Sequence, residues 1–173
     1  MEILKNYING KWIESKEREC LDVLNPANQE VLAKVPYGAG TSSDTNDAVA
    51  AAAEAIKEWR DVPVMQRVQP LYKLKSLLEE HKEEIARLIT LECGKSYAES
   101  LAEMQRGIEN VETACATPTL MQSEFSENIA TGIDEFMIRQ AVGVCACISP
   151  FNFPGMIPFW FLPYAIACGN SFI

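Results

Sequence analysis

The sequence predicts an α/β fold in which a doubly wound parallel sheet is begun but not completed. Residues 141–148 form a nearly continuous apolar run, which is typical of a strand buried on both faces of a parallel sheet. A loop, an apolar segment of helical length and a second strand-like segment follow, the order found in doubly wound domains. Because one and a half strands cannot pair their backbone groups or cover their faces, we expect the folding unit to be larger than these 173 residues.

Composition indicates a folded globular chain and argues against several classes of partner. The sequence is 48% hydrophobic and 23% charged, which provides enough apolar surface to offset the entropy of ordering. Its 15 basic residues are scattered among 24 acidic ones, and the net charge is −9. A nucleic-acid partner requires clustered Lys and Arg, so we expect an acidic, solvated surface and no nucleic acid among the partners.

Neither a membrane anchor nor a metal site is expected. Residues 156–167, the most apolar stretch, are too short to span a bilayer, and residues 1–16 lack the apolar core of a signal peptide. The six cysteines include no Cys-x-x-Cys pair and accompany one histidine, which does not match the ligand spacing of a zinc site. Reduced thiols in a cytoplasmic protein are the expected state.

The N-terminal region predicts short strands. Residues 7–13 place apolar pairs on either side of Asn9-Gly10, the dipeptide that best tolerates a type I′ turn, so they are predicted to form a β-hairpin. Two further strands are predicted at residues 21–24 and 31–35, with a turn between them.

A helical region follows. Residues 49–59 are rich in alanine and predict a helix that begins near the N-cap candidates at 41–44 and is closed by Pro63. An apolar stripe from 71 to 89 predicts one helix, or two helices broken near His81. This lone histidine is expected at the surface or at the helix junction rather than in catalysis.

Residues 97–117 predict one more helix, which we expect Pro118 to stop. Four charged residues recur on or near one face of it, and this face is expected to be solvated and to carry only weak ion pairs. These residues are Glu99, Glu103, Arg106 and Glu109.

The loop at residues 149–154 is the best candidate for a site, because ligands of open α/β sheets bind outside the carboxyl ends of the strands. Two prolines stiffen it, and two phenylalanines offer flat apolar walls. Between them, Asn152 presents an amide donor suited to a developing oxyanion. An Asx-turn with a purely structural role is the alternative. Residues 155–167 then predict a helix, 168–170 its stop and 171–173 a strand.

Several segments, in family order and spread over nearly the whole chain, resemble the aldehyde dehydrogenase superfamily. One such segment alone is weak evidence for the family, but their combination in this order is specific. The matching segments are Tyr7-Ile8-Asn9-Gly10-Lys11-Trp12, Asn25-Pro26-Ala27, Trp59-Arg60, Leu91-Glu92-Cys93-Gly94-Lys95, residues 142–154 and residues 163–170.

Within that superfamily, residues 106–112 and 153–160 resemble the methylmalonate-semialdehyde dehydrogenases, CoA-acylating members that use NAD. The resemblance implies oxidation of methylmalonate or malonate semialdehyde to propionyl-CoA or acetyl-CoA with loss of carbon dioxide. It also implies that residues 1–173 are a partial NAD-binding domain of a homo-oligomer, a dimer or a tetramer. Oligomerisation-type strands are expected near 7–13 and 125–140, and the catalytic domain is expected to be absent.

The resemblance further assigns roles to individual residues. Asn152 is implied to donate to the oxyanion of the covalent intermediates. Arg106 is implied to bind the substrate carboxylate, which a guanidinium fork matches, although a surface helix position is the alternative. The other assignments are Ile148, Ser149, Pro150 and Phe151 on the nicotinamide-ribose side of the NAD cleft, and Phe153 and Ile157 on the wall of the aldehyde pocket.

By the same resemblance, the nucleophilic cysteine, the general-base glutamate, the adenosine-ribose lysine and the glycine-rich cofactor turn are expected beyond Ile173. None of the six cysteines matches the nucleophile, and Gly38-Ala39-Gly40 is expected to be only a loop. The 173 residues alone are therefore expected to be inactive. Two alternatives stay open: a non-acylating NAD(P) aldehyde dehydrogenase with another substrate, and a truncated module that assembles with intact subunits.

Overall fold

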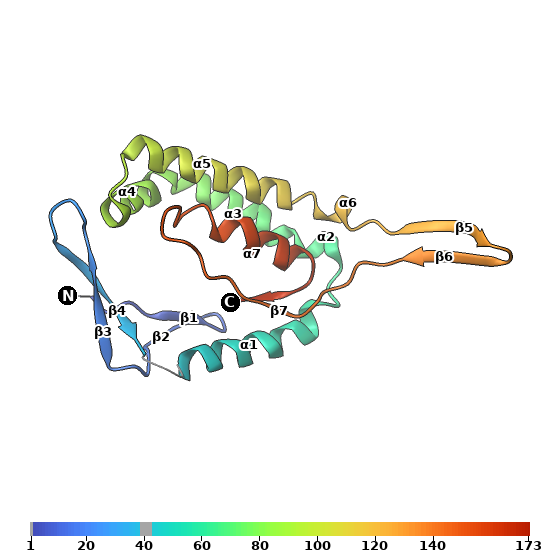
Figure 1. Cartoon of the computed structure of the whole chain (residues 1–173), viewed down its shortest axis with the longest axis horizontal. Coiled ribbons are helices and arrows are strands. Elements are labelled where there is room, and N and C mark those ends of the chain that lie inside the picture. The colour runs from blue at the N-terminus through green and yellow to red at the C-terminus, as the bar shows by residue number, and fades with distance from the viewer. Residues whose placement is uncertain (1, 39–42) are drawn as a thin grey trace.

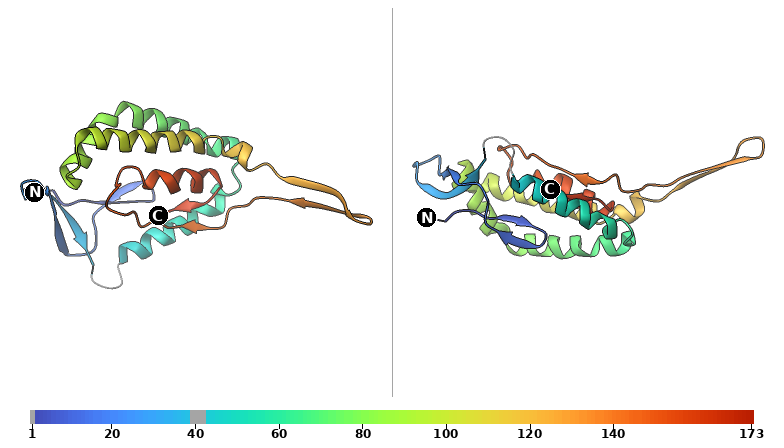
Figure 2. Two further views of the ribbon diagram at one scale, coloured as in Figure 1. Left: turned by 45° about the horizontal axis from the view of Figure 1, so that its top comes forward. Right: turned by 90° about the horizontal axis from the view of Figure 1, so that it is seen from below.

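The computed structural model describes residues 2–38 and 43–173. A group of helices, α3 to α5, lies on one side of the molecule, α1 lies on the other, and α7 lies between them beside a short parallel strand pair (Figure 1). One two-stranded hairpin projects far from this body in every view (Figure 2). The predicted Ala39 and Gly40 of the loop, and Thr41 and Ser42 of the N-cap cluster, lie outside the described residues.

The predicted N-terminal hairpin is confirmed. Strands β1 (Asn6–Ile8) and β2 (Lys11–Ile13) pair antiparallel. Both turn residues have positive φ, 51° at Asn9 and 74° at Gly10, as a type I′ turn requires. A second antiparallel pair follows, formed by β3 (Glu19–Leu24) and β4 (Val31–Tyr37). Both of these strands are two residues longer than predicted.

Helix α1 (Ser43–Trp59) contains the predicted alanine-rich segment, and its first residue lies within the predicted N-cap cluster. Short α2 (Val64–Arg67) then starts after Pro63. Arg67 is buried, 6% exposed, and its guanidinium donates to the carbonyl oxygens of Arg60, Val62 and Ala167. One side chain therefore ties the end of α1 to the end of α7.

The apolar stripe forms two helices, α3 (Gln69–Glu80) and α4 (Lys82–Cys93), so the second of the two predicted alternatives, a break near His81, is the one observed. His81 is exposed and contacts Glu84, which agrees with a junction role. Together with α5 (Tyr97–Ala114), these helices form the main hydrophobic core. The core residues are Val68, Leu71, Leu78, Ile89, Met104, Ile108, Val111, Ala114, Cys115 and Ala167.

The predicted end of α5 is wrong. The helix ends at Ala114, and Pro118 lies in the first turn of another short helix, α6 (Thr117–Leu120). Proline lacks only an N–H that is unpaired in a first turn, so it can begin a helix as well as stop one. Strands β5 (Glu124–Ala130) and β6 (Ile133–Met137) then form the projecting hairpin, in which every residue is exposed.

The α/β unit has the predicted order of strand, loop, helix and strand. Strands β7 (Val144–Cys145) and β8 (Ser171–Phe172) pair in parallel and are connected through α7 (Pro158–Ala167). Helix α1 contacts both strands, while α7 packs on β8. Helices therefore lie on two sides of the parallel pair, as a doubly wound arrangement requires (Figure 1).

The predicted burial of residues 141–148 on both faces is wrong. Val142, Val144 and Ile148 are 89%, 36% and 100% exposed, whereas the odd-numbered residues between them are half-buried. Successive side chains of an extended segment point to opposite faces, and here only one face packs against neighbours. Helix α7 also begins three residues later than predicted, because residues 155–157 belong to the turn that precedes it.

Candidate active site at the 149–157 loop

The loop between β7 and α7 leaves the carboxyl end of β7 and runs beside the junction of α4 and α5 (Figure 1). Two residues of that junction contact its backbone. The Cys93 thiol lies 3.7 Å from the carbonyl oxygen of Phe151, and Lys95 Nζ donates to the carbonyl oxygen of Asn152 at 2.5 Å. Residues more than fifty positions apart in the sequence thus meet at the predicted site.

Glu103 is the buried charge at this contact. Its side chain is fully buried, and its Oε1 accepts hydrogen bonds from the backbone N–H groups of Gly155 at 2.7 Å and Met156 at 3.1 Å. Its Oε2 lies 2.6 Å from Lys95 Nζ. The prediction that Glu103 lies on a solvated face is therefore wrong. A carboxylate is tolerated inside a protein when it is paired and its oxygens are hydrogen-bonded, and three donors meet that need here.

Sequence reasoning missed Glu103 although a signal was present. Ser100 and Gly107, three residues before and four after it, are small and share its face of the helix. Small residues at this spacing allow another backbone to approach closely, and both are buried in the structure. A charge between them therefore belongs to a contact rather than to solvent.

Gly155 allows the loop to come this close. A Cβ atom at this position would lie 2.6 Å from both Ile89 Cδ1 and Met104 Sδ. These two side chains belong to α4 and α5, so the loop is seated directly on the helical core.

Asn152 has a fixed backbone and a free side chain. Its carbonyl oxygen is held by Lys95, but within residues 2–38 and 43–173 its side-chain amide makes no hydrogen bond. The side chain is exposed. An amide with two N–H donors and no protein acceptor is available to a ligand oxygen, so the structural Asx-turn is not what the amide forms here.

Arg106 lies three residues beyond Glu103 on α5, at the edge of the same loop. Its guanidinium carbon is 5.6 Å from the centre of the Phe153 ring, and its Nε lies 3.4 Å from Met156 Sδ. Among the described residues no carboxylate pairs with it. Lys95 Nζ lies 4.2 Å from the centre of the same ring. Phe153 is half-buried, and Ile157, at 8% exposure, is buried at the start of α7.

The first half of the loop is not packed in the same way. Ile148 and Phe151 are 100% and 94% exposed, Pro150 is exposed, and Ser149 Oγ lies 3.5 Å from the thiol of Cys147. The structure thus brings Asn152, Phe153 and Arg106 together and leaves residues 148–151 as an open apolar surface. Such a surface at the carboxyl end of a parallel strand suits a flat cofactor ring.

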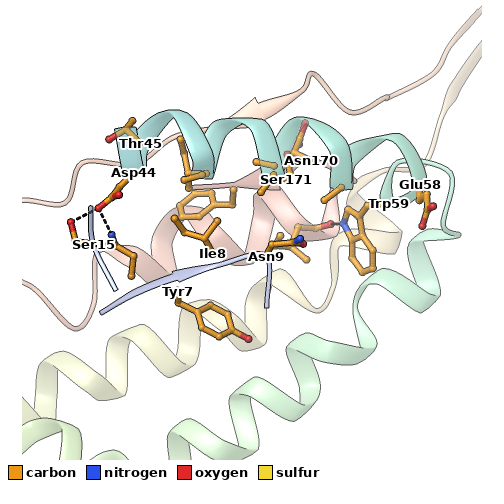
Figure 3. Close-up of a pocket in the computed structure, with 18 of the residues that line it drawn as sticks. Tyr7, Ile8, Asn9, Ser15, Asp44, Thr45, Glu58, Trp59, Asn170 and Ser171 are labelled. Carbon is orange, nitrogen blue, oxygen red and sulfur yellow. Dashed lines mark hydrogen bonds between the residues drawn. The ribbon is translucent and has the colours of Figure 1, made fainter. Parts of the chain in front are cut away.

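A separate groove lies away from this loop. A groove of about 970 Å³ runs between the β1–β2 hairpin, α1 and β8, and Asp44, Trp59 and Asn170 are among its lining residues (Figure 3). None of the residues assigned to the site lines it. Its polar groups serve the fold, since Trp59 Nε1 donates to the carbonyl oxygen of Ile166 at 2.9 Å.

Other chemistry is limited in the part of the chain that the structure describes. It contains no group of three His, Cys, Asp or Glu side chains placed to hold a metal ion. All six cysteines are free thiols. Burial raises the pKa of the Cys115 and Cys168 thiols, which disfavours the nucleophilic thiolate. No described helix combines the length and the apolar character needed to cross a membrane.

Known proteins share both the sequence and the fold. The profile of the aldehyde dehydrogenase family matches residues 12–173. Malonate-semialdehyde dehydrogenase 1 of Geobacillus thermodenitrificans (strain NG80-2) is 53% identical over the whole chain, and malonate-semialdehyde dehydrogenase 2 of Bacillus mycoides (strain KBAB4) is 51% identical. The chain spans 35% of the length of each of these relatives.

Solved structures of dehydrogenases have the same fold as this chain over nearly its whole length. The crystal structure of methylmalonate-semialdehyde dehydrogenase (DddC) from Oceanimonas doudoroffii matches with a TM-score of 0.92 at 40% identity, over 99% of this chain and 35% of that one. A protein of Sinorhizobium meliloti 1021 assigned to the same class and complexed with NAD matches with a TM-score of 0.92 at 37% identity, over 99% of this chain and 35% of its own. The chain therefore belongs to the aldehyde dehydrogenase family, and its mixed helix and strand fold is the N-terminal part of that fold.

Proposed function

We propose that residues 1–173 are the N-terminal part of an NAD-dependent, CoA-acylating aldehyde dehydrogenase that acts on methylmalonate or malonate semialdehyde. The observation that carries this proposal is the Asn152 amide, which has no hydrogen-bonding partner among the described residues and lies in the loop after a parallel strand. Its neighbour Phe153 lies 5.6 Å from the guanidinium of Arg106, for which the described part of the chain offers no carboxylate. The relatives named malonate-semialdehyde and methylmalonate-semialdehyde dehydrogenase support the substrate class.

The two side chains fit the two ends of such a substrate. Malonate semialdehyde carries an aldehyde at one end and a carboxylate at the other. The Asn152 amide donates to the aldehyde oxygen as negative charge develops on it, and the Arg106 guanidinium binds the carboxylate. Phe153 and Ile157 supply the apolar wall between them and exclude water.

NAD fits the open apolar surface at residues 148–151, where Ile148, Ser149, Pro150 and Phe151 would hold the nicotinamide-ribose side. When bound, NAD supplies the hydride acceptor. The overall reaction balances with CoA as the acyl acceptor: malonate semialdehyde, CoA thiol and NAD⁺ give acetyl-CoA, carbon dioxide and NADH. Methylmalonate semialdehyde gives propionyl-CoA in the same way.

A homo-oligomer, a dimer or a tetramer, is part of this proposal. The β5–β6 hairpin exposes a row of large apolar side chains, and an isolated two-stranded hairpin is only marginally stable in water. These residues are Phe125, Ile129, Ile133, Phe136, Met137 and Ile138. A cytoplasmic location is also proposed, supported by the six free thiols.

The first experiment measures the intact mass of the purified native protein and its NAD reduction with malonate semialdehyde, with and without CoA. We expect a mass well above 19.2 kDa and CoA-dependent formation of acetyl-CoA. Turnover without CoA, with a free acid as product, would instead support the non-acylating alternative. A mass of 19.2 kDa with no turnover would contradict the proposal and favour an assembly module.

A further inference from the structure

Two charged side chains hold the backbone of the 152–156 segment at three points. Lys95, between α4 and α5, binds the carbonyl oxygen of Asn152 at 2.5 Å. Glu103, in the second turn of α5, binds the N–H groups of Gly155 at 2.7 Å and Met156 at 3.1 Å. The two side chains bind each other at 2.6 Å. The peptide groups 152–153, 154–155 and 155–156 are thus fixed to one helical unit.

The ion pair between Lys95 and Glu103 is largely buried. Glu103 is fully buried and Lys95 is 17% exposed, so both charges are largely removed from water. Removing either partner of a buried ion pair leaves an uncompensated charge and is strongly destabilising locally. Residues 149–157 form no helix or strand, so the pair adds to weaker or local contacts of this loop. Examples are the Cys93 thiol on the carbonyl oxygen of Phe151 and the Ile157 N–H on the carbonyl oxygen of Phe153.

We propose that Lys95 and Glu103 are positioning residues that set the Asn152 amide relative to Arg106. This inference rests on the proposed oxyanion role of Asn152. Glu103 and Arg106 are three residues apart on α5, so the helix that anchors the loop also carries the carboxylate-binding group. The distance between the two ends of the substrate site is therefore set by one ion pair and one helical turn.

Among the described residues, the same pair leaves Arg106 as the cation at Phe153 that has no carboxylate partner. Two cations approach this ring, Lys95 at 4.2 Å and Arg106 at 5.6 Å from its centre. Glu103 neutralises the charge of Lys95, and the Lys95 ammonium also donates a hydrogen bond to the carbonyl oxygen of Asn152. A substrate carboxylate is thereby directed to Arg106.

The test uses Lys95→Met and Glu103→Gln in the full-length enzyme that carries this segment. Each is expected to lower kcat by about tenfold to a hundredfold, because small displacements of a catalytic group cost that much. The KM for NAD is expected to stay within about threefold, since residues 148–151 are not anchored by the pair. Lys82→Met is the matched control, because Lys82 also joins α4 to α5, through an exposed hydrogen bond to Gln105.

Amide hydrogen exchange tests the inference independently of activity. In both variants the N–H groups of Gly155 and Met156 are expected to exchange at least about tenfold faster, while the core of α5 keeps its protection. Equal acceleration throughout α5 would show a general stabilising role and overturn the proposal. Unchanged kcat in both variants would also overturn it. If instead Asn152→Ala leaves turnover intact, the oxyanion role fails, and the exchange result still shows whether the pair holds the loop.

Discussion

Asn152 combines two properties that an oxyanion donor needs: an anchored backbone and an unoccupied side chain. The anchor is the Lys95 ammonium on its carbonyl oxygen. The amide itself is exposed, and the described parts of the chain, 2–38 and 43–173, offer it no hydrogen-bonding partner. A donor that is fixed before the reaction begins costs no reorganisation when charge develops, and this is why such donors contribute strongly to catalysis.

We expect Asn152→Ala in the full-length enzyme to lower kcat by about a hundredfold or more, as for other oxyanion donors. The measurement is steady-state NAD reduction with malonate semialdehyde. Asn28→Ala, in the exposed turn between β3 and β4, is the control and should keep normal turnover. Equal activity of the Asn152 variant and the control would refute the role.

Arg106→Leu is expected to separate charged from uncharged aldehydes. Loss of a hydrogen-bonded charge contact costs about 1.5–3 kcal/mol, or about tenfold to a hundredfold in kcat/KM for malonate semialdehyde. Propanal, which lacks the carboxylate, should be unaffected. Arg87→Leu, an exposed arginine that pairs with Glu83 on α4, is the control. The carboxylate assignment would fail if both aldehydes lost the same factor.

The Asp44 carboxylate links the N-terminal hairpin, and the segment that follows it, to α1. Asp44, near the start of α1, accepts hydrogen bonds from Asn6 Nδ2 at 2.8 Å, from the Ser15 hydroxyl and from the Lys16 N–H at 3.2 Å (Figure 3). The hydrogen bond from Ser15 is the main cause that lowers the pKa of Asp44 below its ordinary value of about 3.8. The charged form therefore stabilises the junction.

We expect Asp44→Ala to loosen the hairpin from the body of the protein. Loss of these hydrogen bonds should lower the local opening free energy of β1 and β2 by about 1–2 kcal/mol, measured as amide exchange near pH 7. Asp47→Ala is the control and should have a much smaller effect, because the Lys16–Asp47 ion pair is exposed.

The pH dependence of this junction has a defined sign. The folded pKa of Asp44 lies below its unfolded value, so the stabilisation is complete above the unfolded value and is lost as the pH falls through the folded one. Opening of β1 and β2 should therefore increase in acid in the parent protein, and the gap between parent and Asp44→Ala should close. A gap that persists below the folded pKa would contradict this account.

At the scale of the whole molecule, the β5–β6 hairpin does not pack on the hydrophobic core. The β5–β6 hairpin stands away from the helices in all views and buries none of its residues (Figure 2). Phe125 and Phe136 are paired across its strands and are 65% and 72% exposed. Exposed apolar side chains on a paired, extended hairpin are typical of a surface that contacts another subunit.

Phe136→Lys is expected to shift the full-length protein to a smaller species, because a charge would have to be buried at the contact. Light scattering over a range of protein concentrations measures the mass. Ser126→Lys adds the same charge on the same hairpin, at a residue paired with Glu135 and pointing to the opposite face from Phe125. An identical mass for parent and Phe136 variant would exclude this face from the contact.

Local patterns determined much of this protein. The Asn9-Gly10 turn, the break at His81 and the stop at residues 168–170 depend on the conformational preferences of a few neighbouring residues, so each could be predicted from the sequence. The order of strand, loop, helix and strand followed in the same way, whereas the role predicted for Asn152 depended on the family resemblance. The family segments, read in order, added the class of protein.

Only the tertiary structure decided which side chains are buried and which are exposed to solvent. The burial of Glu103, its pairing with Lys95 and the seating of Gly155 on α4 and α5 include contacts between residues more than sixty positions apart, such as Gly155 and Ile89. No local preference specifies such contacts. Likewise, Pro118 begins a helix, and Val142 and Ile148 lie exposed, because packing rather than propensity determines which helix ends and strand faces are covered. Burial is a property of the whole arrangement, so it becomes known only when the elements are assembled.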